Sequence, residues 1–238
     1  MTDSIYDQLN KWDVDDEFFL RIIEKVNPET IGDLGCGTGR LTIPLGEKGY
    51  RMSGYDPDGG AIREAIKKDI NEFIDWHIGT AKDMPTEVYD MVIMTAHVAQ
   101  EMIGDEEWQS TLHDVYRTLK KDGYVTFDSR NPMKKGWEDW TYEKTRKLIS
   151  VPKSDSQAEH WHEFQSISNG IVTFKTSLKE VKTNQIIAEE YSQLSFRTRA
   201  MLENQLKKAG FGHIEVFGDW EFSNATDMSK EFIVLAKK

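Results

Sequence analysis

The chain has 238 residues and a single cysteine, Cys36, which allows one large domain with an insertion and excludes an intramolecular disulfide or a multi-cysteine metal site. Its formal net charge of −11 disfavours nucleic acid as a partner, because an acidic chain is repelled by phosphate backbones. No apolar run approaches the roughly 20 residues that span a bilayer, so we expect a cytoplasmic protein, monomeric or homodimeric, with no membrane partner.

The first half of the chain alternates between strand-like and helix-like patterns. We expect buried strands over residues 30–34, 51–55, 73–78, 89–95 and 124–128, and helices over 16–26, 40–48, 61–68 and 105–119. Lys121-Asp122-Gly123 is expected to form the turn before the fifth strand. Strands that alternate with helices predict a parallel, doubly wound α/β sheet.

The pattern changes to a period of two after the fifth strand. Alternation over residues 144–151, 160–167, 171–181 and 186–196 predicts antiparallel strands, with hairpin turns at Ser168-Asn169-Gly170 and Thr183-Asn184. A helix over 198–209 and strands over 213–217 and 232–236 then return to the α/β pattern. The segment from Arg130 to Ala200 carries a net charge of +3, whereas the remainder carries −14.

The strongest chemical signal is Asp33-Leu34-Gly35-Cys36-Gly37-Thr38-Gly39, placed between a strand and a helix. Glycines at alternate positions let the backbone turn sharply and let a ligand lie against it. The following helix directs its N-terminal amides at the same place. A carboxylate at the strand end, Asp33, is suited to hold a cationic group such as the amino group of a methionine moiety.

A second carboxylate, Asp56, ends the next strand, where an acidic residue can accept hydrogen bonds from both hydroxyls of a ribose. The NAD fingerprint uses the same logic with the spacing G-x-G-x-x-G, which differs from the spacing here. The order of acid, glycine loop, helix and second acid predicts a nucleoside-containing cofactor.

At these residues the chain resembles the class I S-adenosylmethionine-dependent methyltransferases, in particular their small-molecule branch. Asp33-Leu34-Gly35-Cys36-Gly37-Thr38-Gly39-Arg40-Leu41 resembles the family's first motif, and the resemblance continues over nearly the whole chain. The further matching segments are Tyr6-Asp7, Gly54-Tyr55-Asp56-Pro57, Gly79-Thr80-Ala81-Lys82-Asp83-Met84-Pro85, Tyr89-Asp90-Met91-Val92-Ile93 and Ala209-Gly210-Phe211.

The resemblance implies a Rossmann-like, mostly parallel seven-stranded sheet, formed by residues 1–129 and 199–238, with an antiparallel insertion over 130–198 as a lid on the acceptor side. It implies S-adenosylmethionine as the cofactor and no metal. Thr80 replaces the Asp that is usual in the family's adenine loop. The implied cofactor-binding residues are Tyr6, Asp33, Gly35, Cys36, Gly37, Gly39, Asp56, Pro57, Thr80, Ala81, Lys82 and Thr95.

Several residues are candidates for contacting the methyl acceptor because of their place in the chain. His97 comes directly after the fourth strand, where the methyl group should emerge, and is the predicted acid/base or acceptor-orienting residue. Trp137, Trp140, Trp161 and Tyr191 are candidates for an aromatic wall of the acceptor pocket. His160 and His162 fall on one strand face, but no third metal ligand has a clear spacing signal, and we expect no metal there.

The predicted function is methyl transfer to a nitrogen or oxygen of a small molecule. Two alternatives remain open on the sequence: an NAD-dependent oxidoreductase on the same fold, and a module that binds S-adenosylmethionine without catalysis. For the insertion, the alternative to a lid is a sheet that pairs between two chains.

Overall fold

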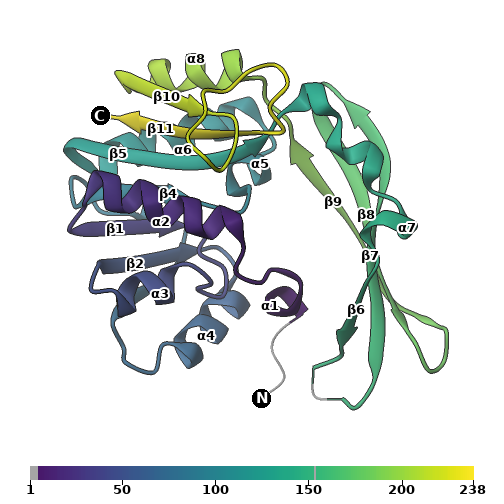
Figure 1. Ribbon diagram of the computed structural model, residues 1–238. Coiled ribbons are helices and arrows are strands. Elements are labelled where there is room, and N and C mark those ends of the chain that lie inside the picture. The colour runs from purple at the N-terminus through teal and green to yellow at the C-terminus, as the bar shows by residue number, and fades with distance from the viewer. Residues whose placement is uncertain (1–4, 153) are drawn as a thin grey trace.

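The computed structural model describes residues 5–152 and 154–238 and contains two sheets (Figure 1). The larger has seven strands in the order β10-β11-β5-β4-β1-β2-β3, and the smaller has four in the order β6-β7-β8-β9. This confirms the predicted Rossmann-like α/β fold with an antiparallel insertion after the fifth strand. Within the described residues, no helix is both long and apolar enough to cross a membrane.

In the seven-stranded sheet, β3, β2, β1, β4 and β5 pair in parallel, and β11 pairs antiparallel with both β5 and β10. The carboxyl ends of the parallel strands therefore meet at one edge, where open α/β sheets bind ligands. The strands are β1 (Thr30–Leu34), β2 (Arg51–Asp56), β3 (Ile74–Ile78), β4 (Tyr89–Met94), β5 (Leu119–Arg130), β10 (His213–Phe217) and β11 (Glu231–Lys237).

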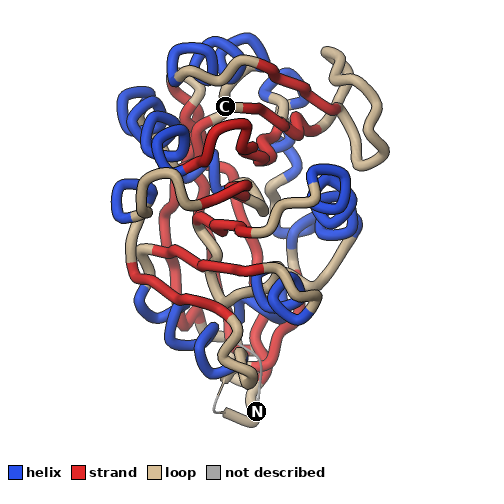
Figure 2. Tube along the Cα trace, turned by 90° about the vertical axis from the view of Figure 1, so that its left-hand side faces the viewer, coloured by secondary structure: helices blue, strands red, loops and turns tan. Residues whose placement is uncertain are grey.

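Helices cover both faces of this sheet, as Figure 2 shows. One core packs α2 and α3 against the strands through residues such as Phe18, Ile22 and Leu45, and the other packs α6 and α8 through residues such as Trp108 and Leu202. The helices are α1 (Ile5–Leu9), α2 (Val14–Val26), α3 (Thr42–Glu47), α4 (Gly59–Lys68), α5 (Val98–Glu101), α6 (Asp105–Thr118), α7 (Tyr142–Thr145) and α8 (Arg199–Ala209).

Helix boundaries differ from the predicted ones where side chains cap the ends. Helix α2 begins at Val14 rather than residue 16, because Asp13 and Asp16 form a capping box at its first turn. It ends where Asn27 takes a left-handed conformation, as predicted before Pro28. Helix α3 is shorter than the predicted 40–48, since the preceding residues continue the turns of the glycine loop.

Two predicted boundaries around the fifth strand and the insertion are wrong. Strand β5 starts at Leu119, and the predicted Lys121-Asp122-Gly123 turn lies inside it as an irregularity, with Asp122 at a φ of 64°. The predicted strand over 144–151 begins as helix α7, because the Thr141 side chain caps the Lys144 amide, and only Lys147–Ser150 forms strand β6.

The insertion sheet is antiparallel throughout and consists of β6 (Lys147–Ser150), β7 (Gln157–Ser168), β8 (Ile171–Glu180) and β9 (Ile186–Ser195). The β7–β8 hairpin turns at Asn169 and Gly170, both at positive φ, as a two-residue turn of this kind requires. This sheet faces the carboxyl edge of the larger sheet, and α1 lies between them (Figure 1).

Candidate functional site

The glycine loop turns directly after β1, and its shape depends on Gly35. Gly35 has a φ of +78°, and a Cβ there would lie 2.5 Å from the Val98 side chain. The amides of Gly35 and Cys36 both donate to the Tyr55 carbonyl, at 2.7 and 3.1 Å. The loop is therefore fixed to β2 and closely packed, so no larger residue fits at Gly35.

The amide of Cys36, one of the predicted cofactor-binding residues, donates to Tyr55, and a contact from Cys36 to a cofactor stays a prediction. Burial raises the pKa of the Cys36 thiol far above the usual range, with further contributions from Asp33 and Asp56. A thiol that stays protonated is a poor nucleophile. Cys36 therefore has a packing role in the loop.

Asp33 lies near the end of β1, just before the glycine loop. Only one oxygen of its carboxylate is hydrogen-bonded to a side chain. Asp33 is 2% exposed, and its Oδ2 accepts a 2.6 Å hydrogen bond from Thr42 Oγ1. Its Oδ1 is buried and finds no hydrogen-bond partner among the described residues. Burial raises its pKa to about 7. Because an unpartnered buried acceptor costs about 1–3 kcal/mol, this oxygen fits a bound cationic donor such as the ammonium of S-adenosylmethionine.

Asp56 is oriented by two backbone amides. Its Oδ2 accepts from the Gly37 amide at 2.9 Å and its Oδ1 from the Asp58 amide at 2.8 Å. Each carboxylate oxygen keeps a further lone pair, which suits the two hydroxyls of a ribose. A contact from Asp56 to a ribose stays a prediction.

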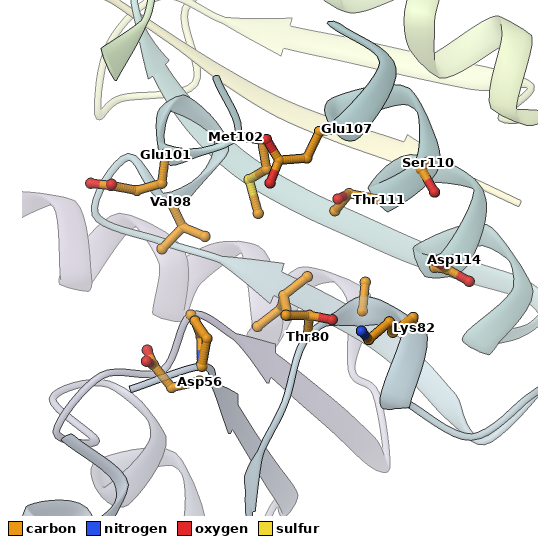
Figure 3. A pocket seen from close by; sticks show the side chains of 14 residues that line it. Asp56, Thr80, Lys82, Val98, Glu101, Met102, Glu107, Ser110, Thr111 and Asp114 are labelled. Atoms are coloured by element: carbon orange, nitrogen blue, oxygen red, sulfur yellow. The ribbon is translucent and has the colours of Figure 1, made fainter. Parts of the chain in front are cut away.

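A cavity of about 670 Å³ extends from Asp56 across the sheet edge (Figure 3). Six of the predicted cofactor residues line it, namely Gly35, Asp56, Pro57, Thr80, Ala81 and Lys82. The opposite wall comes from α5 and α6, and sequence reasoning missed it: Val98, Glu101, Met102, Glu107, Ser110, Thr111 and Asp114. The sequence does contain a signal for the α6 residues. They alternate with buried Trp108 and Leu112 at helical spacing, which marks them as the other face of an amphipathic helix.

Other predicted cofactor residues lie beside this cavity rather than in its lining. Thr95 is buried at the end of β4, and Gly39 packs against Trp76. The Thr80 hydroxyl is bonded to Asp83 at 3.2 Å, and the same carboxylate accepts from the Thr80 amide. This local cap shows that the loop is rigid, while a contact from Thr80 to an adenine stays a prediction.

His97 sits between two carboxylates that no sequence pattern singled out. Its Nε2 lies 3.1 Å from Asp128 Oδ2 and 3.1 Å from Glu231 Oε2. Its backbone amide also donates to the Asp128 carboxylate. His97 has a φ of 67°, which places the ring against the ends of β5 and β11. Ligand atoms of these three residues lie within 4.8 Å of one another.

Asp128 is the most buried member of this cluster, and Arg130 lies near its carboxylate. Asp128 is 1% exposed, and burial raises its pKa while His97 lowers it. Burial lowers the pKa of Arg130, and the nearby carboxylates of Glu231 and Asp128 oppose that shift. The Arg130 guanidinium therefore offsets part of the negative charge of the two carboxylates.

Helix α1 connects the glycine loop to the insertion sheet. The Asp7 carboxylate accepts a 2.6 Å hydrogen bond from Thr38 Oγ1 and pairs with Lys68. Tyr6 lies over the loop, with its Cε1 4.0 Å from where a Gly37 Cβ would stand. Burial raises the Tyr6 pKa, and Asp33 and Asp56 are near enough to contribute. Tyr6 thus lies near the glycine loop, and its contact to a cofactor stays a prediction.

A second cavity of about 670 Å³ separates α1 from the insertion sheet. Its sheet-side lining includes His160, His162, Phe174, Thr176 and Ser192, and its α1 side includes Tyr6. We call the sheet face that carries these side chains the inner face. The two histidine rings pack edge to face at 4.8 Å, as the predicted alternation requires.

The predicted aromatic wall is only partly on this inner face. Trp161 is paired in register with Ser177, and Tyr191 with Lys175, which places both on the opposite face of the sheet. Trp161 packs on Tyr142 there, and Tyr191 is 66% exposed. Trp140, in contrast, packs against Phe174 at a ring distance of 5.0 Å.

Sequence comparison finds similarity to methyltransferases. The family model described as a methyltransferase domain matches residues 31–123. The chain is 22% identical over 247 residues to the glycine/sarcosine/dimethylglycine N-methyltransferase of Actinopolyspora halophila, covering 99% of this chain and 40% of that protein. It is 27% identical over 140 residues to the glycine/sarcosine N-methyltransferase of Aphanothece halophytica, covering 53% and 51%. The chain thus spans about half or less of the length of these relatives.

Solved structures show the same fold over the full chain. An amino pentose methyltransferase from Micromonospora echinaspora, solved with S-adenosylmethionine bound, aligns with a TM-score of 0.72 at 11% identity over 100% of this chain and 98% of that chain. A sugar N-methyltransferase from Streptoalloteichus sp. aligns with a TM-score of 0.74 at 13% identity over 100% and 94%.

Proposed function

We propose that this chain, which belongs to the class I S-adenosylmethionine-dependent methyltransferases, methylates an amine nitrogen of a small molecule. The observation that carries the proposal is the buried, unpartnered Oδ1 of Asp33 beside an oriented Asp56 carboxylate and an open cavity. These groups match the ammonium, ribose and adenine of S-adenosylmethionine in the order in which the cofactor carries them.

The protein's part in cofactor binding divides among these elements. Asp33 accepts from the amino group, Asp56 accepts from the ribose hydroxyls, and the Thr80–Lys82 loop with α6 encloses the base. When bound, S-adenosylmethionine supplies a methyl group on a sulfonium, which is already a good leaving group. What remains for the protein is to align the acceptor in line with the methyl and sulfur and to exclude water.

The acceptor end lies at His97. An amine arrives mainly as an ammonium at neutral pH and must lose a proton before it can attack a methyl group. Glu231 and Asp128 attract the cation, and His97 accepts the ammonium proton, which frees the nitrogen lone pair to attack the methyl group. A hydroxyl acceptor has no charge for these carboxylates to attract, which favours nitrogen over oxygen.

The relatives support a nitrogen acceptor as well. The two curated relatives are N-methyltransferases by name, and one structural neighbour is named a sugar N-methyltransferase. In this chain residues 1–129 and 199–238 would form the cofactor domain and 130–198 the acceptor-side lid. Residues 1–4 and 153 of these ranges lie outside the described residues.

Calorimetric titration with S-adenosylhomocysteine and with NAD tests the cofactor site, and we expect micromolar binding of the first and none of the second. Turnover on a panel of small amines and matched alcohols, followed by mass spectrometry, tests the acceptor. Tight NAD binding without S-adenosylhomocysteine binding would favour an oxidoreductase. Cofactor binding with methylation of alcohols but no amines would contradict the nitrogen assignment.

A further inference from the structure

The inner face of the insertion sheet carries a cluster of Lys147, His160 and His162 that the methyl-transfer site does not use. Lys147 on β6 is the register partner of His160 on β7, so their side chains project side by side. All three residues line the cavity between this sheet and α1. The cluster is therefore built from two strands and lines a cavity that is open to solvent.

Lys147 is a cation without a carboxylate partner among the described residues. Its ammonium donates to the Leu9 carbonyl at 3.1 Å. The other cations at this cavity are neutralised: Arg146 pairs with Glu159 at 2.8 Å, and Lys144 pairs with Asp139. No carboxylate occurs among the described residues that line the cavity, in a protein whose net charge is −11.

The two histidines keep hydrogen-bonding capacity in this space. His162 lines the cavity, and its Nδ1 bonds to Thr176 Oγ1 at 2.8 Å. Burial, then the neighbouring charges of His160 and Lys147, lower the His162 pKa to about 4. Burial and Lys147 also lower the pKa of His160. Both rings are thus neutral at pH 7 and lie beside an uncompensated positive charge.

A continuous row of aromatic and charged side chains joins this cluster to the reacting end. The His162 ring packs on Phe174 at 5.4 Å, Phe174 packs on Trp140 at 5.0 Å, and the Arg130 guanidinium lies 5.8 Å from the Trp140 ring. Arg130 is in turn the register partner of Glu231, which contacts His97. The cluster is therefore linked to His97 through packed side chains.

We propose that Lys147, His160 and His162 bind an anionic group of the methyl acceptor, a carboxylate or a phosphate. The proposal rests on the proposed function for the role of the ligand, but the anion site itself is testable without it. An anion here neutralises Lys147 and accepts hydrogen bonds from the imidazoles. It thereby selects acceptors that carry a negative group.

Other charged and titratable groups lie near the two histidines, and their titration can change the imidazole resonances. They are Tyr6 on α1, Lys144 and Arg146 before β6, Arg130 at the end of β5, and Glu190, the exposed register partner of Thr176 on β9. Their own titrations are separated from that of the histidines by following the imidazole resonances directly.

The experiment is an NMR titration of the histidine ring resonances in the full chain, at constant ionic strength, with inorganic phosphate in one arm and sodium acetate in the other. We expect saturable shifts at His160 and His162 in at least one arm, and a rise in the measured pKa of both rings at saturation. The arm with the tighter binding identifies the anion as phosphate or carboxylate.

Substitutions at Lys147 test whether its charge binds the anion. We expect Lys147→Met to weaken anion binding by roughly tenfold or more and Lys147→Arg to retain it, since a charged hydrogen bond is lost in the first and kept in the second. Lys182→Met, which removes an exposed lysine between β8 and β9, should bind as the unaltered protein does. Absence of saturable shifts in both arms, or equal binding by Lys147→Met, overturns the proposal. Because no methyl donor is present, neither result depends on whether the chain methylates amines.

Discussion

Gln8 and Ser150 form a pair of hydrogen bonds across 142 residues of sequence. The Gln8 amide donates to the Ser150 carbonyl at 2.9 Å, and the Ser150 amide donates to Gln8 Oε1 at 2.8 Å. The side chain thus imitates a neighbouring strand at the edge of β6. Since Asp7 of the same helix binds Thr38 of the glycine loop, α1 mechanically couples the cofactor loop to the insertion sheet.

The first prediction follows from this pair. Gln8→Ala removes both hydrogen bonds, each worth about 0.5–1.5 kcal/mol, and should loosen α1. We expect faster amide hydrogen exchange in α1 and β6, and weaker binding of S-adenosylhomocysteine by a few-fold. The control is Gln165→Ala, which removes an exposed side chain bonded only locally among the described residues. Unchanged exchange in α1 would show that the pair does not hold it.

Asp56 provides the second prediction. Asp56→Ala removes the proposed ribose acceptor and the contact to the Gly37 amide, so binding of S-adenosylhomocysteine should weaken roughly tenfold or more, with the fold intact by circular dichroism. Asp58→Ala, which changes the adjacent cap of α4, serves as the control and should bind nearly normally. An unaltered dissociation constant for Asp56→Ala would refute the assignment.

The third prediction concerns pH. Burial raises the Asp33 pKa to about 7, whereas a bound ammonium favours the ionised carboxylate. Affinity for S-adenosylhomocysteine should therefore fall as pH drops below 7, by about tenfold per pH unit, because a proton must first be removed. Calorimetry at pH 6 and 8 measures this. Asp33→Asn should bind weakly at both values, and a strong pH dependence retained in that variant would contradict the assignment.

Asp33 also affects the stability of the free protein. There the protonated carboxyl is favourable, whereas ligand binding favours the ionised form. The folded-state pKa lies above the unfolded value near 3.9, so the folded protein holds the proton more tightly and loses stability as pH rises from about 4 to 7. Without ligand, Asp33→Asn should melt at a higher temperature than the unaltered protein at pH 8, and the two should converge near pH 4. Equal melting temperatures at pH 8 would show that Asp33 is compensated in the free protein.

His97 is the subject of the fourth prediction. His97→Asn should lower kcat by roughly a hundredfold or more, the usual range for loss of an acid/base group, with little change in cofactor affinity. Asn is chosen because it tolerates the left-handed backbone conformation that His97 adopts. His213→Asn, at an exposed position on β10, is the control. Full turnover in His97→Asn would remove His97 from the proposed chemistry.

The two faces of the insertion sheet give the fifth prediction. Phe174→Ala on the inner face should raise the KM for the acceptor several-fold and leave the cofactor dissociation constant unchanged. Tyr191→Ala on the opposite face should change neither. If Tyr191→Ala changes KM and Phe174→Ala does not, the acceptor binds on the opposite face of the insertion sheet, or that face contacts a second chain.

The register of the insertion shows a limit of sequence reasoning. A period of two divides each strand into two sets, and it correctly placed His160 and His162 together. It does not tell which set faces the cavity, because both faces of this sheet carry aromatic residues. Trp161 and Tyr191 were expected at the acceptor pocket for their chemistry alone, and they lie on the other face.

The sequence by itself determined the fold and the position of the cofactor loop. Strand and helix periods are local, and Asp33, the glycines and Asp56 follow their strands directly, so the parallel order of the strands brings them to one edge. Only the tertiary structure placed Asp128 and Glu231 on His97, from 31 and 134 residues away. Such contacts arise where the ends of β4, β5 and β11 meet, and strand order and register, rather than any local pattern, decide which side chains share that space.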